Sequence, residues 1–441
     1  MADQTEPKDH DRAEPSSSSN PQHPSKKQVQ LVGAPPPGPP IPKDDTHNDD
    51  SDQSSDEAAE EGRDDDQESD PETEDEAEQQ GQEAGGHRNE GNLIQDGSHH
   101  EQAGRQESSA LMTQNGGLPP PPQTVTDPRD EIPDDSELLA DFDGNEDIID
   151  LTHMRLSTTK NLGLARFSKS LTRLCLRQNQ ITKIRSKDIG ILTELRELDL
   201  YDNSIEKIAN LEKLEKLETL DFSFNNLHHI SNVSHLSNCH TLYFVQNKIS
   251  RVRSQDLEGP IASSLRSLEL GGNRLRVIEN IGHLSNLEEL WLGKNKITSL
   301  QGISSLTKLR VLSIQSNRIT KIEGLQNLEA LEELYLSHNG LTKLEGLEKN
   351  TKLKTLDIGA NKIEKIENIS HLKDLEEFWA NDNKIETLND LESQLGPELM
   401  PKLETVYLEG NPVQRKEMTA YRRKIKLALP QISQIDANYV R

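Results

Sequence analysis

The sequence contains no run of about 20 apolar residues, the length that a membrane-spanning helix needs. Its first residues also lack the apolar core of a secretory signal peptide. Two cysteines, Cys175 and Cys239, are too few for a disulfide framework, and we expect both to be free thiols in a reducing compartment. The expectation is a protein that neither spans a membrane nor is secreted.

Motifs for catalysis and for metal or cofactor binding are lacking as well. The segment 293–298, GKNKIT, has the end of a phosphate-binding loop but not the upstream Gly that such a loop requires. No spacing of His and Cys suits a zinc site, and no set of Ser, His and Asp can be assigned. We therefore expect no enzyme activity, no catalytic residue, no metal and no cofactor.

Acidic residues are concentrated in the first third of the chain. Residues 1–140 contain 35 Asp and Glu against 9 Lys and Arg, whereas residues 141–441 contain 42 against 41. The acidic third holds Ser and Pro runs and too little apolar surface to offset the entropy of ordering, so we predict that it is disordered. Ser55, Ser69 and Thr73 precede acidic residues and are candidates for an acidophilic kinase; the alternative is a solvating tail.

From about residue 147 the sequence is periodic. An Asn recurs with seven of its ten intervals equal to 22 residues and the others equal to 24, 26 and 28. This spacing predicts an α/β solenoid, with 22-residue leucine-rich repeats at 147–411 and a C-terminal cap at 412–441, preceded by the disordered acidic region. The recurrent Asn residues stand at positions 179, 203, 225, 247, 273, 295, 317, 339, 361, 383 and 411.

Each L-x-x-L-x-L segment is expected to be a short strand whose Leu residues point inward, stacked in parallel on its neighbours. The Asn follows the strand, where its amide can bond backbone groups that would otherwise lack partners. The return segments should be irregular or 3₁₀, with extra residues around 186–189, 254–263 and 392–401. The cap should cover the last core layer with Ile425, Leu427, Leu429 and Ile432.

The middle x of each L-x-L is expected to face the concave side of the array. Both tryptophans and three of the six tyrosines of the chain fall in this column, interleaved with carboxylates. Aromatic rings supply buried contact area and carboxylates pair with Arg or Lys, so we predict a protein-binding surface. The alternative is that the rings only stack on one another and stiffen the sheet. The column is Cys175, Asp199, Asp221, Tyr243, Glu269, Trp291, Ser313, Tyr335, Asp357, Trp379 and Tyr407.

The charge of this column indicates the kind of partner. About eleven strands spaced at roughly 4.8 Å give an arc of about 50 Å, long enough for a globular domain. The column contains no Lys or Arg to neutralise phosphates, so a basic protein surface is favoured and nucleic acid is disfavoured.

Several segments closely resemble the family of protein phosphatase 1 regulatory subunit 7. They include LRELDLYDN, LYLSHNG, EEFWANDN and YRRKIKLALPQISQIDANYVR, and the resemblance extends over residues 146–441. It implies a nuclear and cytoplasmic regulator that is not itself a phosphatase and that binds the catalytic subunit of type 1 Ser/Thr protein phosphatase through the concave face. A third, inhibitory subunit is an additional partner that the sequence neither requires nor excludes.

The resemblance also implies contact residues. Six family contact positions carry over as Asp221, Glu269, Asp357, Glu377, Trp379 and Tyr407. Two further contact positions, commonly Phe in the family, are Tyr243 and Trp291 in this sequence, which keeps an aromatic ring but changes its size.

One further absence agrees with binding through the folded face. None of the six Phe residues has Val or Ile two places before it, so the short basic-Val-x-Phe peptide of many phosphatase regulators is missing. The competing hypothesis is a generic leucine-rich scaffold or acidic, chaperone-like adaptor whose acidic region binds basic proteins.

Overall fold

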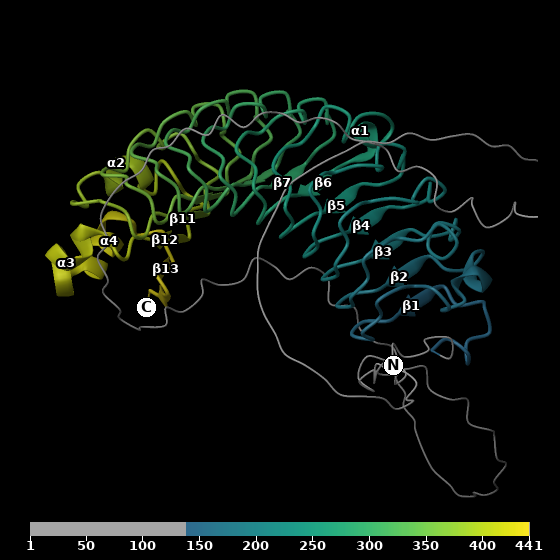
Figure 1. The fold of residues 1–441 in the computed structure, drawn as a ribbon. Helices are drawn as coiled ribbons and strands as arrows, with labels where there is room; N and C mark the ends of the chain where they lie inside the picture. Colours follow the sequence, from purple (N-terminus) through teal and green to yellow (C-terminus); the bar gives the residue numbers. More distant parts are fainter. Residues whose placement is uncertain (1–137, 441) are drawn as a thin grey trace, which may run out of the picture. The chain divides into compact units, whose positions relative to one another are not determined.

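The computed structural model describes residues 138–440, which form a curved stack of repeats (Figure 1). Short strands line the concave side of this stack, and the return segments run along its outer side. The predicted leucine-rich solenoid is thereby confirmed. Of the region 1–140 that was predicted to be disordered, residues 1–137 lie outside the described residues, as do Ser55, Ser69 and Thr73. For residues 138–140 the prediction is wrong, because they form a turn and Leu139 is buried.

One parallel sheet runs through the described repeats, with fourteen strands in sequence order. Only the last pair, β13 and β14, is antiparallel. Strands β1 to β12 have three residues each, and their middle residues are all buried. The strands are β1 (Ile148–Asp150), β2 (Arg173–Cys175), β3 (Glu197–Asp199), β4 (Thr219–Asp221), β5 (Thr241–Tyr243), β6 (Ser267–Glu269), β7 (Glu289–Trp291), β8 (Val311–Ser313), β9 (Glu333–Tyr335), β10 (Thr355–Asp357), β11 (Glu377–Trp379), β12 (Thr405–Tyr407), β13 (Gln434–Ile435) and β14 (Asn438–Tyr439).

The return segments consist mostly of tight turns. Their backbone bonds are of the 3₁₀ type, such as the one from Leu372 N–H to Ile369 O at 3.0 Å, as predicted. Helices α1 and α2 lie in the two repeats with the longest Asn spacing, where extra residues were expected. The helices are η2 (Leu164–Phe167), α1 (Ile261–Ser264), α2 (Leu391–Leu395), α3 (Pro412–Glu417), η3 (Met418–Ala420) and α4 (Tyr421–Ala428).

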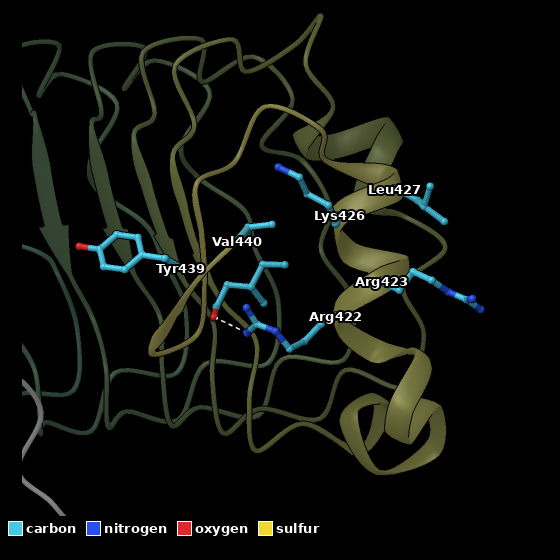
Figure 2. A pocket seen from close by; sticks show the side chains of 7 residues that line it. Arg422, Arg423, Lys426, Leu427, Tyr439 and Val440 are labelled. Atoms are coloured by element: carbon cyan, nitrogen blue, oxygen red, sulfur yellow. Dashed lines mark hydrogen bonds between the residues drawn. The ribbon is translucent and has the colours of Figure 1, made fainter.

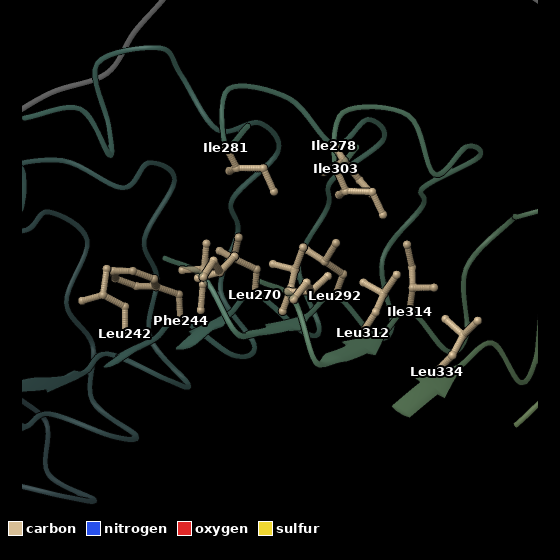
Figure 3. Close-up of a cluster of buried hydrophobic side chains, with 14 of the residues drawn as sticks. Leu242, Phe244, Leu270, Ile278, Ile281, Leu292, Ile303, Leu312, Ile314 and Leu334 are labelled. Carbon is tan, nitrogen blue, oxygen red and sulfur yellow. The ribbon is translucent and has the colours of Figure 1, made fainter. Parts of the chain in front are cut away.

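A single hydrophobic core extends along the stack. In Figure 3, Leu292, which follows β7, and Leu312 in β8 lie opposite return-segment residues such as Ile281 and Ile303. The core begins at Leu139, which is 1% exposed, ahead of the predicted start at residue 147. Each layer is completed by the next repeat, which is why no repeat can bury its leucines alone.

The recurrent Asn side chains join neighbouring repeats. Asn361 accepts the Leu341 N–H at 3.0 Å, and its amide donates to Leu336 O at 3.0 Å and to Ile358 O at 2.9 Å. The same pattern recurs at all eleven Asn positions, from Asn179 to Asn411. The predicted structural role of Asn is confirmed.

The C-terminal cap closes the last core layer, but with three of the four predicted residues. Ile425, Leu429 and Ile432 are at most 1% exposed, whereas Leu427 is 75% exposed, so its prediction is wrong. An α-helix turns about 100° per residue, which places Leu427 on the side of α4 opposite to Ile425. Figure 2 shows Leu427 on the side of α4 that points away from the repeats. Arg422, on the side of α4 that faces the repeats, donates to Ile435 O at 2.7 Å.

Replacing Asn361 by Ala should destabilise the repeat unit by about 3 kcal/mol, because the buried Leu341 N–H would lose its acceptor and Leu336 O would keep only the donor from Asn339. Lys362→Ala is the matched control, since the Lys362 side chain is exposed. The measurement is the midpoint of urea-induced unfolding of each variant. Equal midpoints for the two variants would contradict the role given to Asn361.

Candidate functional site

The eight predicted contact residues lie on the concave side in two groups. Seven of them end a strand, and Glu377 begins β11. Asp221, Tyr243, Glu269 and Trp291 are consecutive register neighbours on β4 to β7. The second group is Asp357, Glu377, Trp379 and Tyr407 on β10 to β12, so strands β8 and β9 separate the two.

The first group concentrates negative charge. Burial, with the neighbouring carboxylates Asp221 and Glu289, raises the pKa of Glu269 to about 6. Burial also raises the pKa of Asp221. Within residues 138–440, no Lys or Arg forms an ion pair with Glu269. Glu269 therefore stands between Tyr243 and Trp291 as a half-buried carboxylate whose ionised form is not compensated.

The second group is organised around Trp379. Its indole Nε1 donates to Glu377 Oε2 at 3.1 Å, and its ring centroid lies 5.6 Å from that of Tyr407 in an edge arrangement. Tyr407 Oη in turn accepts a hydrogen bond from Gln434 Nε2 at 2.7 Å. Burial raises the pKa of Glu377. These contacts fix the orientation of Trp379 while leaving it half-buried rather than fully covered.

Tyr335 links the two groups. Its ring lies 6.4 Å from the ring of Trp291 with 21° between the planes, across the small side chain of Ser313. Its hydroxyl donates to Glu333 Oε2 at 2.8 Å. The column thus contains stacked rings, as expected if the aromatic residues stiffen the sheet. Stacking and partner binding are compatible, because Trp291 keeps part of its surface exposed.

The aspartates of the column face the concave side, but two of them are buried, since Asp357 is 4% and Asp199 8% exposed. Asp357 Oδ1 accepts the Gly359 N–H at 2.9 Å, and Asp221 Oδ1 accepts the Ser223 N–H at 2.7 Å. A short Asp side chain reaches the backbone two residues further on, so it folds down against the end of its own strand. Asp357 and Asp221 therefore have a structural role in addition to any contact with a partner.

A third cluster was not predicted from the sequence. The Arg177 guanidinium lies 4.4 Å from the ring centroid of Tyr201, and the Tyr201 ring lies 4.8 Å from that of Phe224. Arg177 also pairs with Asp199 at 3.0 Å and with Asp221 at 3.6 Å. The signal in the sequence is an aromatic residue, Phe224, directly before a consensus Asn and outside the concave column.

No group of three or more His, Cys, Asp or Glu residues among residues 138–440 could hold a metal ion. Within these residues, every helix is too short or too polar to traverse a lipid bilayer. Cys175 and Cys239 are both buried and free.

Comparisons with known proteins agree with the repeat geometry. The family model described as leucine-rich repeats (2 copies) matches residues 169–238 and 263–393 in overlapping pairs. Protein phosphatase 1 regulatory subunit SDS22 of Schizosaccharomyces pombe is 46% identical over 85 residues, which are 19% of this chain and 24% of that relative. Protein phosphatase 1 regulatory subunit 7 of Bos taurus is 67% identical over 39 residues, 9% of this chain and 10% of that relative. The chain thus contains leucine-rich repeats, and over the matched stretches it is similar to these protein phosphatase 1 regulatory subunits.

The matched stretches span a quarter or less of these relatives' length. Among solved structures, an internalin from Listeria monocytogenes is similar with a TM-score of 0.52 and 23% identity, covering 69% of this chain and 89% of that one. At this identity the likeness concerns the fold alone. The eight contact residues implied by the family resemblance all lie on the concave side, and their role in binding stays a prediction.

Replacing Asp221 by Asn should lower the pKa of Glu269 from about 6 toward its ordinary value, because a neighbouring negative charge is removed. Since the pKa of Glu269 is raised in the folded state, its ionisation destabilises the fold as pH rises through about 6. The measurement is an NMR titration of the Glu269 carboxyl carbon. Glu206→Gln, at an exposed position, is the control and should leave this pKa unchanged. An unchanged pKa in Asp221→Asn would show that burial and Glu289, not Asp221, set the value.

Proposed function

We propose that this protein is a regulatory subunit that binds the catalytic subunit of type 1 Ser/Thr protein phosphatase through the concave column. The observation that carries the proposal is the position of Glu269, a half-buried carboxylate without a cationic partner among residues 138–440, between the half-buried rings of Tyr243 and Trp291, with Trp379 and Tyr407 on the same concave surface. The printed names of the relatives supply the identity of the partner, since those proteins are named as regulatory subunits of this phosphatase.

The carboxylates indicate the charge of the partner surface. Glu269 carries a negative charge at neutral pH in surroundings that already raise its pKa. A Lys or Arg of the partner beside Glu269 would stabilise that charge and replace the water lost on docking. The partner surface is therefore basic where it meets strands β4 to β7.

Trp379 provides the apolar contribution at the other end of the column. A half-buried Trp whose Nε1 is already bonded within the protein can bury its remaining apolar surface without leaving a donor unpaired. Its orientation is fixed by Glu377 and Tyr407, so little rotamer entropy is lost on binding. Both features are typical of residues that dominate the energy of an interface.

The proposed role is regulatory, and no catalytic step is assigned to the chain. We further propose that the protein is present in the nucleus and the cytoplasm, as its resemblance to the family implies. Imaging of the tagged full-length chain tests this localisation. A third, inhibitory subunit would add to the complex without replacing the concave contact.

The competing function is a scaffold or acidic adaptor that captures basic proteins through the acidic region. The two functions differ in which part of the chain retains the phosphatase. A chain lacking residues 1–137 should still retain it on our proposal and should lose it on the alternative.

Replacing Trp379 by Ala should weaken binding of the phosphatase catalytic subunit by about 2 to 4 kcal/mol, the usual cost of truncating a dominant interface residue. The thermal unfolding midpoint should change little, because Trp379 contributes no surface to the core. The measurement is isothermal titration calorimetry with the full-length chain, together with a thermal melt.

Two control variants accompany this experiment. Leu427→Ala removes an apolar side chain that is 75% exposed on the cap and points away from the repeats, and it should leave both quantities unchanged. Leu356→Ala removes a fully buried core residue and should cost about 2 to 5 kcal/mol of stability. Wild-type affinity in Trp379→Ala, or a melt as low as that of Leu356→Ala, would return Trp379 to a role in stacking alone.

A further inference from the structure

The residue directly before each consensus Asn has the same unusual backbone conformation in all eleven repeats. Its φ is positive, in the left-handed region that bulky residues adopt rarely. Most repeats place a small or polar residue there, which limits the strain. These turn residues are Gln178, Asp202, Phe224, Gln246, Gly272, Lys294, Ser316, His338, Ala360, Asp382 and Gly410.

Phe224 is the one large apolar residue among these eleven, with φ at 57°. It is also 40% exposed, in contrast to the core residue Phe222, which is fully buried. The ring of Phe224 therefore neither relieves the strain of its backbone nor completes the core. An exposed aromatic side chain in a conformation that disfavours it is the kind of local conflict that marks functional positions.

The surroundings of Phe224 hold it in place. Its ring lies 4.8 Å from the ring of Tyr201, and the guanidinium of Arg177 covers Tyr201 at 4.4 Å. Arg177 is itself paired with Asp199 and Asp221. Because Asp221 belongs to the concave column, the cluster of Arg177, Tyr201 and Phe224 is continuous with the candidate site.

We propose that Arg177, Tyr201 and Phe224 form a second contact surface for the partner of the concave column, with Phe224 buried against an apolar side chain of that partner. This inference rests on the proposed function, because it assigns the same phosphatase subunit to both surfaces. The charge of the cluster supports an apolar contact at Phe224, since Arg177 is already compensated by two carboxylates and leaves no cation for an acidic group. A fixed ring of this kind loses little entropy when it is covered.

The test is Phe224→Gln in the full-length chain, because Gln already occupies the same turn position as Gln178 and Gln246, with φ of 55° and 53°. The variant should bind the phosphatase catalytic subunit about tenfold more weakly, as expected for loss of an aromatic interface residue. Its thermal midpoint should be equal to or higher than that of the wild type, because Gln is less strained there. His338→Gln, an exposed turn residue in a distant repeat, is the matched control and should change neither quantity.

The outcomes separate this inference from the function on which it rests. Wild-type affinity in Phe224→Gln, with weakened binding in Trp379→Ala, would overturn the second contact surface and leave the proposed function intact. A fall of the thermal midpoint that accompanies any loss of affinity would also overturn it, because the ring would then be structural. If the wild-type chain does not bind the phosphatase subunit, the proposed function fails and this inference fails with it.

Discussion

The hydrogen bonds of the consensus Asn are the interaction on which the rest of the structure depends. Each Asn amide bonds its own strand end and the preceding repeat, so it fixes both the exit of the chain from the sheet and the stacking of the next layer. An Asp or Leu could not supply both the donor and the acceptor that this position requires. Because all eleven repeats use the same bonds, the strands stay in one register and their outward residues form straight columns.

That regularity has an electrostatic consequence. Parallel strands in register lie about 4.8 Å apart, so outward residues of adjacent strands are immediate neighbours whatever their charge. Asp221 and Glu269 flank Tyr243 on this column; burial raises the pKa of both carboxyl groups, and the Asp221 charge raises that of Glu269 further. A basic partner surface would stabilise the ionised carboxylates and so offset the free-energy cost of burying them. The register that stabilises the core thus places carboxylates on the concave side, where a cationic surface would stabilise them.

The sequence predicts the solenoid, its core and the placement of the contact column, because a 22-residue period and a strand period of two leave little freedom in which residues point inward. It does not predict how far a side chain folds down against its own strand, which is why Asp357 is buried rather than exposed. The prediction that Leu427 covers the core is wrong for a different reason: Leu427 lies on the side of helix α4 that faces outward. Phe224 lies outside the column, and only its backbone conformation and exposure distinguish it.

The central claim is that the concave face, not the cap or the outer side, receives the phosphatase. Hydroxyl-radical footprinting of the full-length chain with and without the catalytic subunit tests this claim most directly, because aromatic and sulfur-containing side chains report their own exposure. Trp291 and Trp379 should oxidise more slowly in the complex, while Met418, which is 75% exposed on the cap, should oxidise at an unchanged rate. Protection of Met418 with no protection of the two tryptophans would contradict the account.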